Sequence, residues 1–326
     1  MMRIIPLILL LGAAMVCSGA GPAWAAEDLS PRCQFAEKDA GARLLQESDR
    51  FLESLSEFEL QSRLQTKDDV SLKARQRFVA AQVLYWTDSE KAMLRRLLDQ
   101  VSAKFPVDLL PETVIFIKTT GKEEGGAAYC RRHAVALPLR LLQMPDDRLQ
   151  RLLVHELFHV ISSHQPALRK QLYAIIGFTT CAALELPESL RDRKITNPDA
   201  PLIDCFIRLQ AGDREFAAAP ILFATPATYD VSAGGTFFRY LTFRVMELEE
   251  TAGKRQVRLE NGEPVLHDPR QLASYAEQIG RNTNYIIHPD EILADNFVSL
   301  VLADGNLKTP RIIEAMRQVL DQHSTP

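Results

Sequence analysis

The stretch RLLVHELFHVISSH, residues 151–164, constrains this chain more than any other. His155 and His159 are four residues apart, so on a helix both imidazoles project from one face, one turn apart. They can then bind one metal ion together, at the roughly 2.0–2.1 Å of a zinc–nitrogen bond. Glu156 lies off that line, where it can accept a proton from a metal-bound water. The surrounding residues are mostly apolar, so this polar trio is costly to bury unless something binds it.

A third ligand is expected on a second helix. Catalytic zinc takes three protein ligands and leaves one position for water. In HPDEILADNF, residues 288–297, Glu291 and Asp295 are again four apart on a predicted helix. We expect Glu291 to bind the metal and Asp295 to accept the free N–H of a ligating histidine.

Other residues are alternatives for these roles. His164 is out of register with the longer metzincin motif, which needs Gly at position 162 and His at position 165. Alternative third ligands without a carboxylate partner at helical spacing are Asp230, Glu247, Glu249, Glu250 and His267. Oxyanion donors, among which the sequence does not choose, are Tyr229, Tyr240, Tyr285 and His288. For His288 a polar role near a helix cap is favoured.

HELFH followed by EILAD resembles the gluzincin class of zinc metallopeptidases, whose signature is HExxH with a later E-x-x-x-D on a second helix. The resemblance implies a zincin-like metallopeptidase domain with one Zn²⁺, held by His155, His159 and Glu291. It implies Glu156 as the general base and Asp295 as the carboxylate that orients a ligand histidine. It also implies a β-hairpin before the HExxH helix whose edge strand binds peptide, and TVIFIKTTG and AAYCRRHAVALP occupy that place.

The resemblance has limits along the chain. The spacer between His159 and Glu291, residues 160–290, is 131 residues and longer than is familiar in the class. The helical N-terminal third is not covered by the resemblance. The expected function is hydrolysis of peptide bonds in peptides or proteins by metal-activated water. The alternatives are a zinc hydrolase of another amide or ester, and a non-catalytic envelope binding protein, against which the intact Glu156 argues.

Residues 1–25 are typical of a signal peptide. Arg3 precedes an apolar run from 4 to about 17, and Ala-Trp-Ala at 23–25 offers a cleavage site. Cleavage predicts a periplasmic or secreted protein, with acylation at Cys17 as the minor alternative. No later stretch is apolar enough to span a bilayer. The net charge of -4, without a basic stripe, gives no case for binding nucleic acid.

Export would place the remaining cysteines in an oxidising compartment. Two disulfides are therefore expected, with the connectivity open, and the alternative is four reduced, mostly buried thiols. No two have the C-x2-4-C spacing of metal ligands. These cysteines are Cys33, Cys130, Cys181 and Cys205.

Periodicity predicts an α+β protein. Residues 26–105 form a helical region, with a capping box at Thr87 and Glu90, packed on a metallopeptidase domain of residues 106–326. In that domain we expect strand-like runs between 106 and 138, the motif helix from 145 to 164 and a short helix ended by Gly177. We expect an irregular stretch from 187 to 230, then strands with a hairpin turn at Asn261-Gly262. Two helices, starting near 289 and 309, follow.

Overall fold

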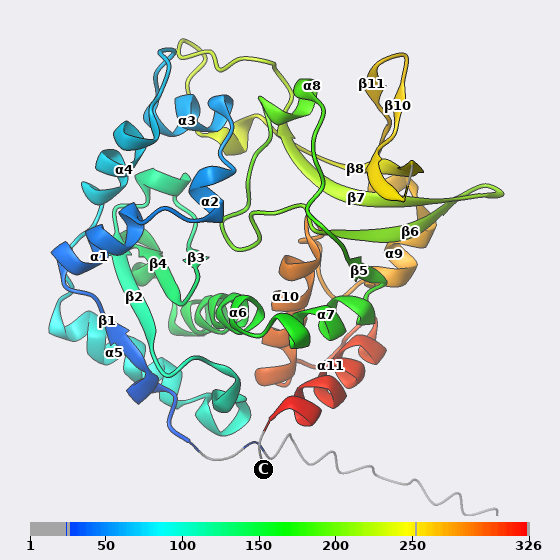
Figure 1. Ribbon diagram of the computed structural model, residues 1–326. Helices are drawn as coiled ribbons and strands as arrows, with labels where there is room; N and C mark the ends of the chain where they lie inside the picture. Colours follow the sequence, from blue (N-terminus) through cyan, green and yellow to red (C-terminus); the bar gives the residue numbers. More distant parts are fainter. Residues whose placement is uncertain (1–23, 25–26, 252, 325–326) are drawn as a thin grey trace, which may run out of the picture.

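The structure is a computed structural model that describes Trp24 and residues 27–251 and 253–324. Apart from Trp24, the predicted signal peptide of residues 1–25 lies outside the described residues. The architecture is α+β, as predicted, with one four-stranded and one six-stranded sheet. Helix α6 (Asp146–His164) runs through the middle of the molecule (Figure 1) and packs on α10 (Pro289–Val301).

The four-stranded sheet has the order β1-β2-β4-β3. Its first three strands in that order are parallel, and β3 pairs antiparallel with β4 at the edge. The expected hairpin between TVIFIKTTG and AAYCRRHAVALP is therefore wrong: the hairpin lies within the second run, and β4 inserts between β2 and β3. Alternation identifies strands but not their pairing direction. The strands are β1 (Cys33–Phe35), β2 (Val114–Thr119), β3 (Tyr129–Arg131) and β4 (Ala134–Pro138).

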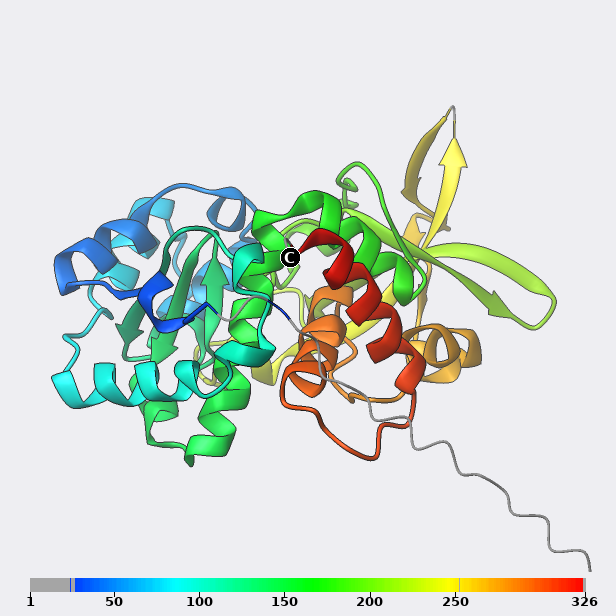
Figure 2. The same ribbon diagram turned by 90° about the horizontal axis from the view of Figure 1, so that it is seen from below.

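Short helices of residues 26–105 surround this sheet, and Figure 2 shows them in blue and cyan on one side of the molecule. The predicted capping box is confirmed, with Thr87 and Glu90 bonding reciprocally. The region also contributes β1 to the sheet, a strand that the helical periodicity did not indicate. Its helices are α1 (Lys38–Gln46), α2 (Arg50–Glu53), α3 (Glu57–Leu64), α4 (Leu72–Ala80) and α5 (Asp88–Asp99).

The six-stranded sheet is antiparallel, with the order β12-β8-β7-β6-β5 and with β9 also paired to β8. The expectation of an irregular stretch from 187 to 230 is wrong for 205–224, which form β6 and β7. β7 is buried continuously along AAPILFA, residues 218–224, so the sequence shows no alternation there. The strands are β5 (Phe178–Thr180), β6 (Cys205–Ala211), β7 (Arg214–Ala224), β8 (Leu241–Thr251), β9 (Lys254–Val257) and β12 (Leu266–His267).

The predicted Asn261-Gly262 hairpin is confirmed. β10 (Leu259–Glu260) pairs antiparallel with β11 (Glu263–Pro264). Asn261 has a φ of 53° and Gly262 a φ of 85°, the positive values that a two-residue type I′ turn needs.

The remaining helices include the predicted ones. α7 (Pro166–Ile175) ends before Gly177, and α10 and α11 (Pro310–His323) begin with proline, whose missing N–H costs nothing in a first turn. α8 (Glu188–Arg191) and α9 (Ala273–Ile279) were not predicted. Across the described part of the chain, every helix is too short or too polar to cross a membrane.

The four cysteines are free in the structure, so the predicted disulfides are not formed. Cys33 and Cys130 lie in β1 and β3, at opposite edges of the four-stranded sheet. Cys205 pairs with Thr180, so the next residue, Cys181, faces the other side of its sheet. Consistent with this, Cys205 and Cys181 pack in different apolar clusters.

Candidate metal centre

The structure brings His155, His159 and Glu291 together from α6 and α10. Nε2 of His155 is 3.1 Å from Oε2 of Glu291, and Nε2 of His159 is 3.5 Å from the same oxygen. One ligand atom from each residue lies within 4.8 Å of the others. Two ligands of a tetrahedral ion with bonds of about 2.0 Å are about 3.3 Å apart. The two distances to Glu291 are close to this value, so the three residues could hold a metal ion.

A carboxylate holds the other ring nitrogen of each histidine. Nδ1 of His155 is 3.1 Å from Oδ1 of Asp295, as the sequence predicted for a partner carboxylate. Nδ1 of His159 is 2.7 Å from Oδ2 of Asp290. With each carboxylate accepting the Nδ1–H, Nε2 on the Glu291 side is the nitrogen that a metal can take.

Asp290 was missed by the sequence reasoning. It is 1% exposed, and it also accepts hydrogen bonds from the hydroxyls of Ser162 at 2.5 Å and Tyr173 at 2.9 Å. The available signal was a second acidic residue next to Glu291 at the start of an apolar helix. The four-residue spacing rule did not identify Asp290, because adjacent residues in a helix do not share a face. Asp290 nevertheless contacts α6 from its position next to Glu291.

The electrostatics of the cluster favour a bound cation. Burial alone would lower the pKa of His155, but hydrogen bonds to Asp295 and Glu291 outweigh it and raise the pKa to about 10. Burial alone would raise the pKa of Glu291, but the charge of His159 and hydrogen bonds to both imidazoles hold it well below its usual range. Without a metal the raised pKa keeps the His155 imidazole protonated beside the ionised Glu291, and a divalent ion can replace that positive charge.

Glu156 lies beside the three donor atoms. It is 4% exposed, and its Oε2 accepts a hydrogen bond of 3.4 Å from Sγ of Cys130. Its Oε1 accepts none from the described residues. Burial raises the pKa of Glu156 against the opposing charges of the two imidazoles. The side chain therefore has a free oxygen in the position and environment of a proton acceptor.

A cavity of about 570 Å³ opens onto the site, lined by His155, Glu156, His159 and Glu291. Of the four candidate oxyanion donors, Tyr285 lines this cavity, with its ring centroid 6.4 Å from that of His155. The others are engaged elsewhere: the hydroxyl of Tyr229 bonds Gln65 and that of Tyr240 bonds Gly234. Nδ1 of His288 caps α10, accepting from the N–H of Asp290, so the cap role expected for His288 is confirmed.

The alternative third ligands do not line the cavity. Glu247 and His267 bond each other on the six-stranded sheet, where Arg214 and Arg258 also pair with Glu247. The other three are exposed at the surface: Asp230, Glu249 and Glu250.

A further neighbour of the site comes from the irregular segment before β6. Nδ2 of Asn197 donates a hydrogen bond of 2.6 Å to Oε1 of Glu291. Asp199, two residues on, lines the same cavity and lies with Cys130 and Glu156 in a second cluster of potential ligand atoms. No motif in the sequence indicated either residue.

Comparison with known proteins adds no relative: no family model, curated protein or solved structure matches this chain.

Proposed function

We propose that this protein is a zinc peptidase of the gluzincin type, with a zincin-like fold, that hydrolyses peptide bonds in peptides or proteins. The observation that carries the proposal is the convergence of two Nε2 atoms on one oxygen of Glu291, at 3.1 and 3.5 Å. Glu156, with its free oxygen, lies alongside. A structural role for the same residues would not require a cavity at the open side of the cluster.

His155, His159 and Glu291 would hold the ion. When bound, zinc supplies a Lewis acid that polarises the scissile carbonyl and lowers the pKa of water. Glu156 accepts a proton from the attacking water and delivers it to the leaving nitrogen. Asp290 and Asp295 keep both imidazoles in the Nδ1–H tautomer.

The proposal places the mature protein in the periplasm or outside the cell, following removal of residues 1–25. The same ligands would also serve a hydrolase of another amide or ester. Assays on matched peptide, amide and ester substrates separate these two reactions. The buried Glu156 with its free oxygen favours a hydrolase over a binding protein.

Metal analysis of the purified protein tests the site directly. We expect one zinc per chain in the wild type, and loss of zinc in His155→Ala and in Glu291→Ala. The matched control is His164→Ala, which removes an exposed histidine from the same helix. Full retention of zinc by Glu291→Ala would contradict the ligand set.

Activity tests the reaction. Glu156→Gln should retain zinc and lose a factor of about 10² to 10⁴ in peptide hydrolysis. If this variant kept full activity, or if it supported the same cellular phenotype as the wild type while deletion of the gene did not, the peptidase proposal would fall.

A further inference from the structure

Residues 196–199 cross the candidate metal centre and are tied down at each end. The backbone N–H and hydroxyl of Thr196 donate to Glu59 at 2.7 and 2.9 Å. Asn197 donates to Glu291, and Oδ1 of Asp199 accepts a hydrogen bond of 2.6 Å from the backbone N–H of Cys130 in β3. The segment is therefore a fixed part of the cavity wall.

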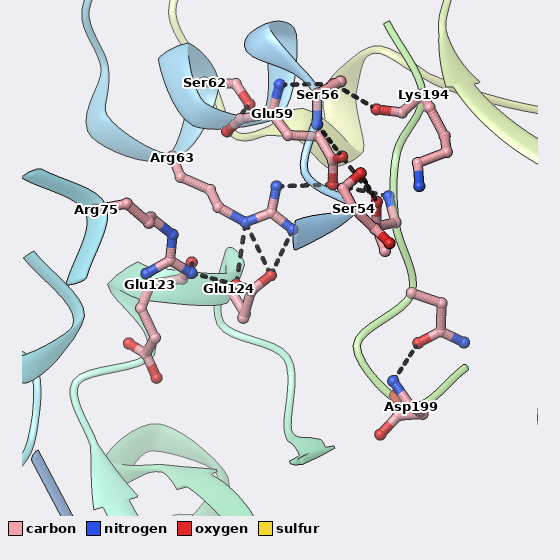
Figure 3. Close-up of polar contacts among 12 residues, drawn as sticks. Ser54, Ser56, Glu59, Ser62, Arg63, Arg75, Glu123, Glu124, Lys194 and Asp199 are labelled. Carbon is pink, nitrogen blue, oxygen red and sulfur yellow. Dashed lines mark hydrogen bonds and ion pairs between the residues drawn. The ribbon is translucent and has the colours of Figure 1, made fainter. Parts of the chain in front are cut away.

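The tie at Thr196 belongs to a buried network of charges, shown in Figure 3. Glu59 pairs with Arg63 at 3.1 Å, and Arg63 pairs with Glu124 at 2.7 Å. Arg75 also pairs with Glu124, at 2.5 Å, and the side chains in these pairs are at most 2% exposed. Breaking such a network is energetically costly, so it holds residues 196–199 in place.

Asp199 occupies the free edge of the four-stranded sheet. β3 is the edge strand beside the metal centre, and its Cys130 N–H points away from β4. An extended peptide that paired along β3 would need this donor, and the Asp199 carboxylate already takes it. Asp199 lies where the metal cavity meets a neighbouring cavity of about 680 Å³, since it lines both. A substrate chain therefore cannot pair with β3 at Cys130.

Burial and the charges of Glu156 and Glu291 raise the pKa of Asp199 against the opposing charge of His159, so its ionised form depends on a cationic partner. Four carboxylates, from Glu156, Asp199, Glu291 and Asp295, line the metal cavity together with the guanidinium groups of Arg140 and Arg151. Among the described residues, no lysine or arginine lies within ion-pair distance of Asp199, and its Oδ2 accepts no hydrogen bond. A carboxylate in a cavity wall is stabilised by a cationic group, and a substrate ammonium is such a group.

Distance distinguishes the α-ammonium group of a substrate from the side-chain ammonium group of a lysine. The ligand atoms of Cys130, Glu156 and Asp199 lie within 4.8 Å of one another, so Asp199 is close to the proposed base. An α-ammonium nitrogen is about 2.5 Å from the carbonyl carbon of its own residue. A lysine ammonium stands at the end of a four-carbon stem, much farther from its carbonyl. Only the first fits beside a carbonyl that Glu156 can serve.

Positive charge lies at the opposite end of the cavity. Arg151, which pairs with Asp304 at 2.7 Å, is on α6 one turn before His155, whereas Asp199 is near His159, one turn after it. The guanidinium of Arg140 bonds the carbonyl of Gly126, with no carboxylate in the described chain within ion-pair distance. A short peptide with its amine at Asp199 would extend toward these arginines.

We infer that Asp199 binds the α-ammonium group of the substrate, so that the enzyme removes residues from the amino end of peptides. This inference rests on the proposed function and names its substrate class. Hydrolysis adds water across the first peptide bond: Glu156 moves one proton from that water to the leaving nitrogen, and the hydroxyl oxygen stays on the released residue.

Binding tests Asp199 apart from catalysis. We would titrate zinc-loaded Glu156→Gln protein with the tripeptide Leu-Gly-Gly, its N-acetyl form and N-acetyl-Lys-Gly-Gly, by calorimetry. The free amine should bind at least about tenfold more tightly than the acetylated peptide. Adding Asp199→Asn should abolish this difference, because asparagine still accepts from Cys130 but carries no charge. Zinc content and melting temperature should stay unchanged.

Three outcomes would overturn the inference. Equal binding of the free and acetylated peptides would remove the ammonium site, and so would a preference that survives Asp199→Asn. Tight binding of N-acetyl-Lys-Gly-Gly would assign the site to side-chain ammonium groups instead.

Product analysis of the wild type separates this inference from the proposed function. A decapeptide with a free amine should lose residues one at a time from its amino end, and its acetylated form should stay intact. Internal cleavage of the acetylated form would overturn the inference and leave a peptidase. Cleavage of neither peptide by the zinc-loaded protein would overturn the proposed function, while the binding comparison still decides the role of Asp199.

Discussion

The side-chain amide of Asn197 donates to Oε1 of Glu291 at 2.6 Å, while Oε2 of the same carboxylate faces both imidazoles. The amide therefore decides which carboxylate oxygen is presented to a metal. A residue from an irregular segment, 94 positions from its partner, orients the third candidate ligand.

Replacing Asn197 should weaken metal binding without removing a ligand. In Asn197→Ala the Glu291 carboxylate loses its orienting donor and can rotate away, so we expect zinc affinity to fall about tenfold or more. Competition with a zinc chelator measures this. Asn282→Ala is the comparison, since Asn282 lines the same cavity but bonds Asn296 and Thr309. Equal affinities in wild type and Asn197→Ala would refute the orienting role.

Asp290 should matter to the metal as much as the carboxylate that the sequence predicted. Asp290→Asn turns the acceptor facing Nδ1 of His159 into a weaker partner that can present an N–H instead. We expect a loss of about 10- to 100-fold in zinc affinity, and a similar loss in Asp295→Asn. Chelator competition on both variants, with circular dichroism to verify folding, gives the comparison. An Asp290→Asn protein with wild-type affinity would show that Asp290 has a structural role only.

Breaking the buried network around Arg63 on one side should strongly destabilise the fold. Arg63→Met leaves Glu59 and Glu124 without their shared partner in a buried site, which should lower the free energy of unfolding by about 3–5 kcal/mol. Arg208→Gln removes an exposed pair with Glu215 and should change it by less than about 1 kcal/mol. Urea unfolding measures both. Similar effects in the two variants would contradict the burial argument.

Lowering the pH should remove the contribution of Glu247 to the free energy of unfolding. Hydrogen bonds from Arg214, His267 and Arg258 outweigh burial and lower the pKa of Glu247 from 4.5 to about 2. A depressed pKa stabilises the folded state above pH 4.5, and that stability is lost as the pH falls toward 2. Glu247→Gln should therefore destabilise the protein by about 1–3 kcal/mol at pH 7 and by much less near pH 2.5.

Urea titrations at the two pH values test this dependence, with Glu249→Gln as the exposed control on the same strand. A difference between wild type and Glu247→Gln that stayed constant from pH 7 to pH 2.5 would show that the carboxylate is not stabilised by its ion pairs.

Local rules predicted the elements that carry the site. The four-residue spacings of His155 with His159 and of Glu291 with Asp295 follow from helical geometry, and both helices form as expected. The Asn261-Gly262 turn and the cap role of His288 are likewise local. The alternation rule failed where burial is two-sided, as in β7, and it could not give the parallel pairing of β2 with β4.

By itself, then, the sequence determined which side chains share a helix face, because that depends on a few neighbouring backbone angles. Only the tertiary structure decided that Asp290 supports His159, that Asn197 orients Glu291 and that Asp199 closes the edge of β3. These contacts join segments tens of residues apart, and their geometry follows from how helices and sheets pack rather than from any periodicity.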